Sequence, residues 1–266
     1  MPEGHTIRRL ALDLNKTLKP GPVAASSPQG PFSEGAAHLD GKRLIDADSW
    51  GKHLFCEFKG APLLHIHLGL IGKLRQFPAD REVEGAIRLR LIGEEKLWDL
   101  TGPMVCSLID DDDQHVIIDK LGPDPLRTDS DPEVFAERLS RRRIPIAAAL
   151  LDQKVIAGIG NVYRSEFCFL IGIHPETPAN ALSEDHRYQL WEMAVEQLKQ
   201  GVRLNRITTR DPEEVGESPG RISGDDRLYV YKRDGKPCHR CGTEIRLIEV
   251  AKRKAWFCPQ CQVTPT

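Results

Sequence analysis

The chain of 266 residues lacks the features that place a protein in a membrane or outside the cell. It contains no apolar run that approaches the length of about 18 residues needed for a spanning helix. Its start also lacks a basic segment followed by an apolar stretch, which is the pattern of a secretion signal. We therefore expect a cytoplasmic protein that has no membrane partner.

The sequence also lacks a large net charge, because 37 basic residues nearly balance 39 acidic ones and leave a formal charge of −2. This balance alone argues against a polyanionic partner. The distribution of charge argues for one, since the segment from Arg221 onward holds ten Lys and Arg residues against five acidic ones. A terminal segment with a net charge of +5 on a nearly neutral protein is typical of nucleic-acid contact.

Four of the seven cysteines form two Cys-x-x-Cys pairs that are separated by sixteen residues: Cys238, Cys241, Cys258 and Cys261. In a chain without a secretion signal, such pairs predict a metal site rather than disulfides. The spacing fits a tetrahedral four-thiolate site on a β-hairpin. Four protein ligands leave no open position, so we expect one structural Zn²⁺ whose binding stabilises the segment. The remaining cysteines should be buried apolar residues: Cys56, Cys106 and Cys168.

The sequence begins Met1-Pro2-Glu3-Gly4-His5. Removal of Met1 would free the secondary amine of Pro2, which can attack a carbonyl-like carbon. The neighbouring carboxylate of Glu3 can then move protons. Many chains begin Met-Pro without consequence, so this interpretation depends on the motifs that follow.

The first half of the chain predicts a helix followed by strands. Apolar residues from Ile7 to Leu18 recur at helical spacing until Pro20-Gly21-Pro22 ends the pattern. From Arg43 to Ile118 the pattern has period two, with turn sequences that include Asp110 to Asp113. We expect a β-sandwich or barrel here. Leu121-Gly122-Pro123-Asp124-Pro125-Leu126 then breaks both periodicities and is the candidate hinge.

Beyond this hinge the sequence predicts helices, a loop and the cysteine ribbon. Asp131-Pro132 is a helix start, and Ser183 caps an amphipathic segment that Gly201 closes. The stretch from Thr208 to Asp226 has no periodicity, and we expect a mobile loop. The chain contains no internal repeat.

Three shorter motifs each allow a functional and a structural interpretation. In Val155–Asn161, Gly158 and Gly160 would let the backbone approach a phosphate, whereas Asn161 could equally be only an N-cap for residues 162–171. Lys52 begins a strand after a turn, where most lysines are simply solvated. Arg253 lies between two lysines on the cysteine hairpin, either as a solvated charge or as a bidentate phosphate clamp.

Two further motifs lie close together in the strand region. His65 and His67 alternate along one strand, and because no third ligand accompanies them we interpret them as structural histidines. Leu70 is an apolar residue at the tip of a Gly69-Leu70-Ile71-Gly72 turn. Such a side chain can act as a wedge in a base stack.

Together these segments resemble the formamidopyrimidine-DNA glycosylase and endonuclease VIII family, in particular its actinobacterial endonuclease VIII-like branch. The resemblance runs nearly end to end. Its motifs occur in family order: Pro2-Glu3-Gly4, Gly51-Lys52, His67-Leu68-Gly69-Leu70, Leu121 to Leu126, Gly158-Ile159-Gly160-Asn161 and the four terminal cysteines.

The resemblance implies an α+β multidomain fold. A helix-flanked β-sandwich would occupy residues 1–120, and a hinge would follow over 121–127. A helical domain with a helix-two-turn-helix motif would cover 128–225, and a β-hairpin zinc finger 226–266. The resemblance further implies a bacterial, nucleoid-associated monomer that binds duplex DNA with damaged or abasic sites in a cleft between its halves.

Carried over to this chain, the resemblance makes Pro2 the nucleophile and Glu3 the proton shuttle. Lys52 would be a proton donor and a phosphate or sugar contact. Asn161 and Arg253 would contact phosphates around the flipped nucleotide, and Arg253 would also take part in the second elimination. Lys120 would be a basic DNA contact and Leu70 the wedge. At Gly158 and Gly160 the backbone would approach the DNA closely.

One motif departs from the family, because many relatives carry a second Pro-Glu where this chain has His5-Thr6. In this chain the auxiliary role of that carboxylate is taken by His5, by water or by no group at all.

The implied function is a bifunctional DNA glycosylase and AP lyase of base excision repair. It would remove oxidised bases through a Schiff base on Pro2 and cut the strand by β,δ-elimination. Pro2-Glu3-Gly4 favours oxidised pyrimidines over oxidised purines such as 8-oxoguanine, which form the competing substrate class.

Two functions without this chemistry compete with it. One is a non-catalytic zinc-ribbon protein that binds damaged DNA. The second is an RNA-associated zinc module, for which only Trp256 and Phe257 offer stacking surfaces. No segment identifies a base-reading loop or a protein partner.

Overall fold

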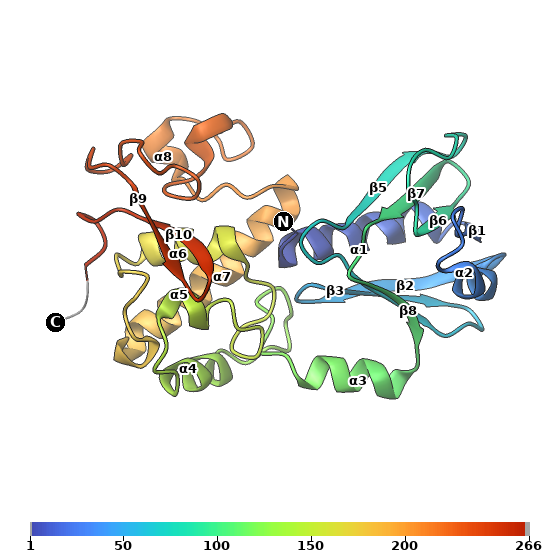
Figure 1. Ribbon diagram of the computed structural model, residues 1–266, viewed down its shortest axis with the longest axis horizontal. Coiled ribbons are helices and arrows are strands. Elements are labelled where there is room, and N and C mark those ends of the chain that lie inside the picture. Colours follow the sequence, from blue (N-terminus) through green and yellow to red (C-terminus); the bar gives the residue numbers. More distant parts are fainter. Residues whose placement is uncertain (1, 264–266) are drawn as a thin grey trace. The chain divides into compact units, whose positions relative to one another are not determined.

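The computed structural model describes residues 2–263, which divide into two compact units after Lys120 (Figure 1). The first unit contains α1 (Gly4–Leu18), β1 (Pro22–Ser26), α2 (Ser33–Leu39), β2 (Lys42–Trp50), β3 (His53–Phe58), β4 (Leu63–His67), β5 (Lys73–Pro78), β6 (Leu89–Ile92), β7 (Lys96–Thr101), β8 (Val105–Ile109) and α3 (Asp111–Asp119). No helix within the described residues is long and apolar enough to cross a membrane.

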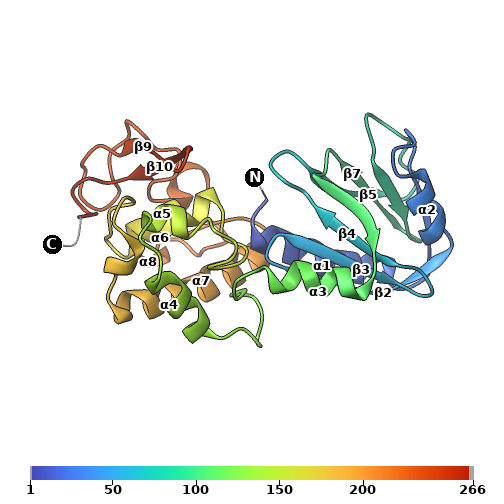
Figure 2. The same ribbon diagram turned by 60° about the horizontal axis from the view of Figure 1, so that its bottom comes forward.

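The strands of the first unit form a sandwich of two antiparallel layers that β1 joins (Figures 1 and 2). Pro22 and Val23 pair with β2, whereas Ala24 to Ser26 pair with β6. The continuous strand order β5-β7-β6-β1-β2-β3-β4-β8 therefore folds over at β1. The predicted β-sandwich is confirmed.

The core of this unit draws on both layers and on α1. Leu54 and Ile66 from one layer are buried in the same cluster as Trp98 and Leu100 from the other. The predicted stripe of the first helix, from Ile7 to Leu18, is buried with them. Burial of this stripe fixes the orientation of α1, and therefore of the residues at its start.

One element of this unit differs from the prediction. The predicted period-two pattern extended to Ile118, but residues 111–119 form α3. The side chain of Asp110 accepts a hydrogen bond from the Asp113 amide and so caps the helix. Asp111 to Asp113 then place three carboxylates in the first turn, where the helix dipole favours negative charge. The aspartate run that was predicted as a turn is therefore a helix start.

The second unit consists of helices and a terminal hairpin. Its elements are α4 (Pro132–Ser140), α5 (Ile146–Ala149), α6 (Asn161–Leu170), η1 (Ala179–Ala181), α7 (Glu184–Leu204), α8 (Pro212–Val215), η2 (Gly224–Arg227), β9 (Arg246–Val250) and β10 (Arg253–Phe257). The predicted helix starts at Asp131-Pro132 and Ser183 are confirmed, and both side chains accept a hydrogen bond from the first turn.

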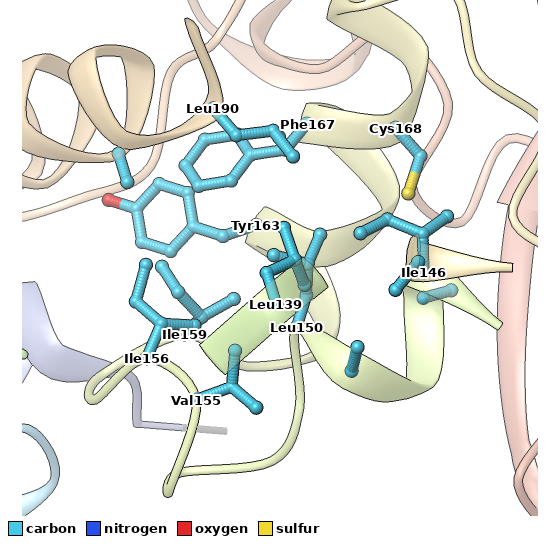
Figure 3. Close-up of a cluster of buried hydrophobic side chains, with 14 of the residues drawn as sticks. Leu139, Ile146, Leu150, Val155, Ile156, Ile159, Tyr163, Phe167, Cys168 and Leu190 are labelled. Atoms are coloured by element: carbon cyan, nitrogen blue, oxygen red, sulfur yellow. The ribbon is translucent and has the colours of Figure 1, made fainter. Parts of the chain in front are cut away.

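An apolar cluster holds α4, α5, α6 and α7 together (Figure 3). Tyr163 and Phe167 of α6 lie at its centre, with ring centroids 5.2 Å apart. Leu139 of α4, Ile146 of α5 and Leu190 of α7 pack around them. The cluster thereby fixes α6, which carries Asn161 at its start.

Two predictions for this unit were wrong in detail. Helix α7 does not end at Gly201 but continues to Leu204, because Asn205 adopts the left-handed conformation and terminates it. The stretch from Thr208 to Asp226 is not without structure, since it contains α8 and begins with buried residues. The polar composition of this stretch did not indicate burial. A polar residue can be buried here because the hydroxyl of Thr209 donates to the buried carboxylate of Glu166.

The candidate hinge, residues 121–127, is part of the second unit and packs against its other residues. The amide of Gly122 donates to the carbonyl of Gln153 at 2.7 Å, and the amide of Ala157 donates to the carbonyl of Pro123 at 3.0 Å. Residues 122–125 are buried. Hinge motion about this segment stays a prediction.

The hairpin is tied to the end of α6 by the last described residues. The side chain of Gln262 donates to the Ile173 carbonyl at 3.0 Å, and the amide of Val263 donates to the Gly172 carbonyl at 3.1 Å. The amide of His174 donates in turn to the Val263 carbonyl at 3.1 Å. The chain therefore returns from the hairpin to the helical core.

Candidate functional site

The start of α1 carries the first two predicted residues. Pro2 is half-buried, and Glu3 is completely buried. Glu3 has extended backbone angles (φ −122°, ψ 175°) and occupies the N-cap position of this 15-residue helix. The structure thus places a buried acid beside Pro2.

A hollow of about 500 Å³ joins Pro2 to the predicted wedge. Its lining consists of Pro2, Thr6, Leu70, Ile71, Gly72 and Lys73. Residues from the β4–β5 turn and from the start of α1 therefore share one surface. A larger hollow of about 880 Å³ is lined by residues of β2, β3 and the start of α3, and it contains no predicted site residue.

The tip that carries Leu70 is more apolar than the sequence indicated. Leu70 is 58% exposed, Ile71 is 79% exposed and Met104 is 66% exposed. Met104 packs on Gly69, where an added Cβ atom would lie 2.9 Å from the Met104 Cβ. The sequence reasoning missed Ile71 and Met104, because Met104 comes from the separate β7–β8 turn and only the fold brings it there.

Lys52 lies in a two-residue turn rather than on a strand. Trp50 pairs with His53, so Gly51 and Lys52 form the tip of the β2–β3 hairpin. Gly51 has a φ of 57°, which suits the first central position of such a turn. Lys52 is half-buried, and its positive charge contributes to lowering the pKa of both His53 and His67. The ammonium therefore lies close to these two rings.

The pairing of β3 with β4 adds a third histidine to His65 and His67. Nδ1 of His53 lies 2.9 Å from Nε2 of His65, and the two rings stack at 5.1 Å. The rings of His53 and His67 meet edge to face at 4.7 Å. Burial first, then the neighbouring charges, lowers the pKa of His53 to about 3. Burial also lowers the pKa of His65 to about 4.

These histidines contact one another directly, through the approach of His53 to His65 and the ring contact of His53 with His67. Among the described residues, the ligand atoms that converge as a group are those of the four cysteines. The neutral ring of His67 accepts a hydrogen bond at Nδ1 from the amide of Gly69 at 3.1 Å. The histidine cluster therefore supports the turn that presents Leu70.

In the second unit, Gln153 shapes the glycine motif before α6. Its side-chain oxygen accepts from the Gly158 amide at 3.0 Å, and its side-chain nitrogen donates to the Ile159 carbonyl at 3.0 Å. Gly158 has a φ of 88°, a conformation that only glycine adopts easily. Gly160 is the N-cap residue and Asn161 is the first residue of the helix, so Asn161 is not the cap. The sequence reasoning missed Gln153, whose partners are set by the loop conformation.

The fold brings Asn161 to the strand that begins with Arg253. Nδ2 of Asn161 donates to the Lys254 carbonyl at 3.1 Å. The completely buried guanidinium of Arg164 donates to the carbonyls of Arg253 at 3.1 Å and Lys254 at 2.8 Å. Nothing in the sequence distinguished Arg164 from a surface arginine.

Arg253 itself follows a strained turn. Ala251 and Lys252 have φ values of 51° and 60°, which are unusual for residues other than glycine. The side chain of Arg253 is exposed, as is that of Lys120 at the end of α3 in the first unit. The predicted roles of Arg253 and Lys120 stay predictions.

The four cysteines form the predicted zinc centre. Their Sγ atoms all lie within 4.8 Å of one another, and two of the separations are 3.9 Å (Cys238 to Cys261) and 3.4 Å (Cys241 to Cys258). Tetrahedral Zn–S bonds of about 2.3 Å place sulfur atoms about 3.8 Å apart, so the group fits one Zn²⁺. The β9–β10 hairpin lies between the two Cys-x-x-Cys pairs. The prediction of one structural zinc ion is confirmed.

Three family models match the chain in the order of its elements. The formamidopyrimidine-DNA glycosylase N-terminal domain matches residues 1–99, the formamidopyrimidine-DNA glycosylase H2TH domain matches residues 121–213, and the zinc finger found in FPG and IleRS matches residues 235–263.

Individual proteins match over almost the whole chain. Endonuclease 8 1 of Mycobacterium tuberculosis is 42% identical over 267 residues, which cover 98% of this chain and 100% of that protein. The formamidopyrimidine-DNA glycosylase of Ligilactobacillus salivarius is 33% identical, with 99% and 98% covered. A solved complex of the Lactococcus lactis enzyme Fpg with DNA containing an abasic site superimposes with a TM-score of 0.79 at 27% identity, with 98% and 100% covered. The chain therefore belongs to the formamidopyrimidine-DNA glycosylase and endonuclease VIII family, whose members are DNA glycosylases and AP lyases of base excision repair.

Proposed function

We propose that this chain excises oxidised pyrimidines from DNA through a covalent intermediate on Pro2 and cuts the strand by β,δ-elimination. The observation that carries the proposal is the hollow in which Pro2, beside the buried Glu3, shares a surface with the exposed Leu70. We interpret Pro2 as the nucleophile, Glu3 as the acid and Leu70 as the apolar wedge. Relatives that share the chain's whole length include an endonuclease 8 at 42% identity.

In the proposed mechanism, the damaged nucleotide leaves the base stack and Leu70 fills the gap. Unstacking costs a few kcal/mol and is cheapest for a damaged base, which supplies part of the selectivity. The neutral Pro2 nitrogen, formed after removal of Met1, attacks C1′ and the base departs. An α-amino group has a pKa of about 8, so a substantial minority of the amine is neutral and nucleophilic at neutral pH.

Strand cleavage follows from the same intermediate. The iminium on Pro2 acidifies the C2′ proton, and its loss drives β-elimination of the 3′ phosphate. A second elimination releases the 5′ phosphate and leaves a one-nucleotide gap. We assign phosphate contacts to Lys52, Asn161, Arg253 and Lys120, because each offers a polar or cationic side chain near the surface.

The test is borohydride trapping with an oligonucleotide that carries one abasic site. Wild-type protein should form a covalent adduct, because borohydride reduces the imine to a stable amine. Pro2→Gly, or a chain with a blocked amino terminus, should lose the adduct. Pro28→Gly changes an exposed proline in a turn outside the hollow and is the matched control. An unimpaired adduct from Pro2→Gly would refute the assignment of the nucleophile.

Oxidised purines are the second candidate substrate. The Lactococcus lactis enzyme Fpg has been solved with DNA that contains Fapy-dG, and this complex superimposes with a TM-score of 0.80 at 28% identity. Cleavage of duplexes with 5-hydroxyuracil or thymine glycol should exceed cleavage of duplexes with 8-oxoguanine. The reverse order would favour the purine assignment while leaving the Pro2 chemistry intact.

A further inference from the structure

His5 and Thr6 form a contact at the wall of the Pro2 hollow. Oγ1 of Thr6 lies 3.2 Å from Nε2 of His5. Thr6 lines the hollow together with Pro2, whereas the ring of His5 is only 5% exposed. A residue that lines the hollow therefore contacts a buried imidazole through its hydroxyl.

This contact is not the usual arrangement for threonine in a helix. A helical threonine hydroxyl commonly bonds to the carbonyl one turn earlier. Thr17 of the same helix does so, since its Oγ1 donates to the Asp13 carbonyl at 2.8 Å. The residue one turn before Thr6 is Pro2, which precedes the helix. The Thr6 hydroxyl turns instead to the neighbouring ring.

The ring of His5 is neutral at neutral pH. Burial first, and then the positive charge at the amino terminus, lowers its pKa to about 4. Charged groups in this part of the unit include Glu3 before the helix, Lys73 of β5 in the hollow, and Arg8, which pairs with Asp48 of β2. A neutral imidazole protonated at Nδ1 offers Nε2 as an acceptor for the Thr6 hydroxyl.

We propose that Thr6 and His5 are a proton-accepting pair that serves the Pro2 nitrogen; this rests on the proposed function. After Pro2 N bonds to C1′ and the base leaves, the nitrogen carries one proton too many. That proton passes to Thr6 Oγ1 while the Thr6 hydroxyl proton passes to His5 Nε2. The freed lone pair on nitrogen then expels the ring oxygen O4′, which takes a proton from Glu3, and the iminium forms.

The charges balance over this step when Glu3 enters it as a neutral carboxylic acid. Nitrogen loses one proton, His5 gains one, and Glu3 gives its acid proton to O4′ and becomes a carboxylate. His5 afterwards returns its proton through Thr6 to solvent in the hollow, because a buried imidazolium is unstable. Glu3 therefore protonates O4′, and the Thr6–His5 pair removes the proton from the Pro2 nitrogen.

The test measures the rate of imine formation by single-turnover trapping with abasic-site DNA across a pH series. Thr6→Val keeps the shape and removes the hydroxyl, and it should slow trapping at neutral pH by about 100-fold, within the range for general acid–base groups. The rate of this variant should then rise with pH more steeply than the wild-type rate, since hydroxide replaces the lost acceptor. The dissociation constant for DNA should not change.

Three further variants separate chemistry from folding. Thr6→Ser keeps a hydroxyl and should restore the wild-type pH profile. His5→Gln keeps a hydrogen-bonding group that cannot take a proton, and it should behave like Thr6→Val. Thr128→Val removes a hydroxyl from an exposed residue outside the hollow and should match wild type.

The outcomes distinguish this inference from the function it rests on. Trapping by wild type with an equal rate and pH profile in Thr6→Val would overturn the proton-accepting pair alone. A Thr6→Ser rate as slow as that of Thr6→Val would overturn it as well. Absence of any adduct from wild type would instead refute the proposed function.

Discussion

At the scale of single residues, the carboxylate of Glu166 holds the segment that leads into the zinc hairpin. Glu166 is completely buried on α6. It accepts hydrogen bonds from the amides of Tyr229, Val230 and Tyr231 at 2.8 to 2.9 Å, and from the hydroxyl of Thr209. Four donors therefore bond to the two oxygens of one buried carboxylate, and replacement of either oxygen leaves two of them without that acceptor.

We predict that Glu166→Gln lowers the free energy of unfolding of the second unit by about 3 kcal/mol, the usual size for breaking a buried charged network. The amide offers one acceptor oxygen where the carboxylate offers two. Urea titration followed by tryptophan fluorescence measures the loss. Glu217→Gln changes an exposed carboxylate and is the matched control. A loss for Glu166→Gln no larger than that of the control would show that the network does not stabilise the fold.

At the scale of elements, the β3–β4 pair assembles His53, His65 and His67 into one cluster. The pKa of His53 is lowered to about 3 and that of His65 to about 4, against 6.5 for an unfolded histidine. Between these values the unfolded chain binds protons that the folded chain does not. The cluster's contribution to the free energy of unfolding is therefore fully present above about pH 6.5 and falls as the pH drops toward about 4.

We predict that the first unit loses up to about 1.4 kcal/mol per pH unit for each fully shifted histidine, and less for the half-buried His53 and His67. His65→Phe keeps a ring to stack on Phe55 and removes one titrating group. Urea unfolding of this variant should show a shallower dependence on pH below about pH 6.5 than wild type. An unchanged slope would mean that His65 does not contribute to the acid sensitivity.

The elements also show what a sequence can and cannot predict. Helix starts were predictable, because Asp131-Pro132 and Ser183 act through hydrogen bonds within one turn. The zinc ligands were predictable, because their spacing along the chain is the signal. Contacts between distant elements were not predictable. The buried guanidinium of Arg164 donates to the Lys254 carbonyl, but in the sequence Arg164 cannot be told from a surface arginine.

The candidate site divides in the same way. Local motifs indicated Pro2, Glu3 and Leu70, whose roles stay predictions, and the structure places Pro2 and Leu70 on one hollow. The exposed apolar surface that Ile71 and Met104 add was not predictable, because the two turns that carry them come together only in the folded chain. The contact of Thr6 with His5 was hidden as well, because neighbours on a helix do not ordinarily face each other.

At the scale of the whole molecule, the two units have separate apolar cores and should respond separately to the loss of zinc. Binding of a structural Zn²⁺ contributes about 10 to 16 kcal/mol in small zinc modules, and here that energy organises residues 238–261. We predict that a chelator lowers the melting temperature of the second unit and leaves that of the first unit unchanged. Calorimetry with and without chelator measures both transitions.

Cysteine variants provide the control for this prediction. Cys241→Ser should reduce the zinc content below one ion per chain, and Cys106→Ser, in the first unit, should keep one ion. Metal analysis of the purified proteins measures both. A first unit that melts earlier after chelation would contradict the separation of the two cores.

The bonds that tie Gln262 and Val263 back to Gly172, Ile173 and His174 also govern biosynthesis. A ribosome adds about 5 to 20 residues per second, and domains fold in the order in which they emerge. The β-sandwich is complete in sequence after residue 120, whereas the helical half waits for partners that are translated more than 80 residues after α6 ends. All members of the helical core precede Cys258, so a nascent chain stopped before that residue would hold a complete β-sandwich and a complete set of core residues. It would lack two zinc ligands and the bonds that tie the hairpin to the end of α6, and this unanchored hairpin is what chaperones and proteases would meet first.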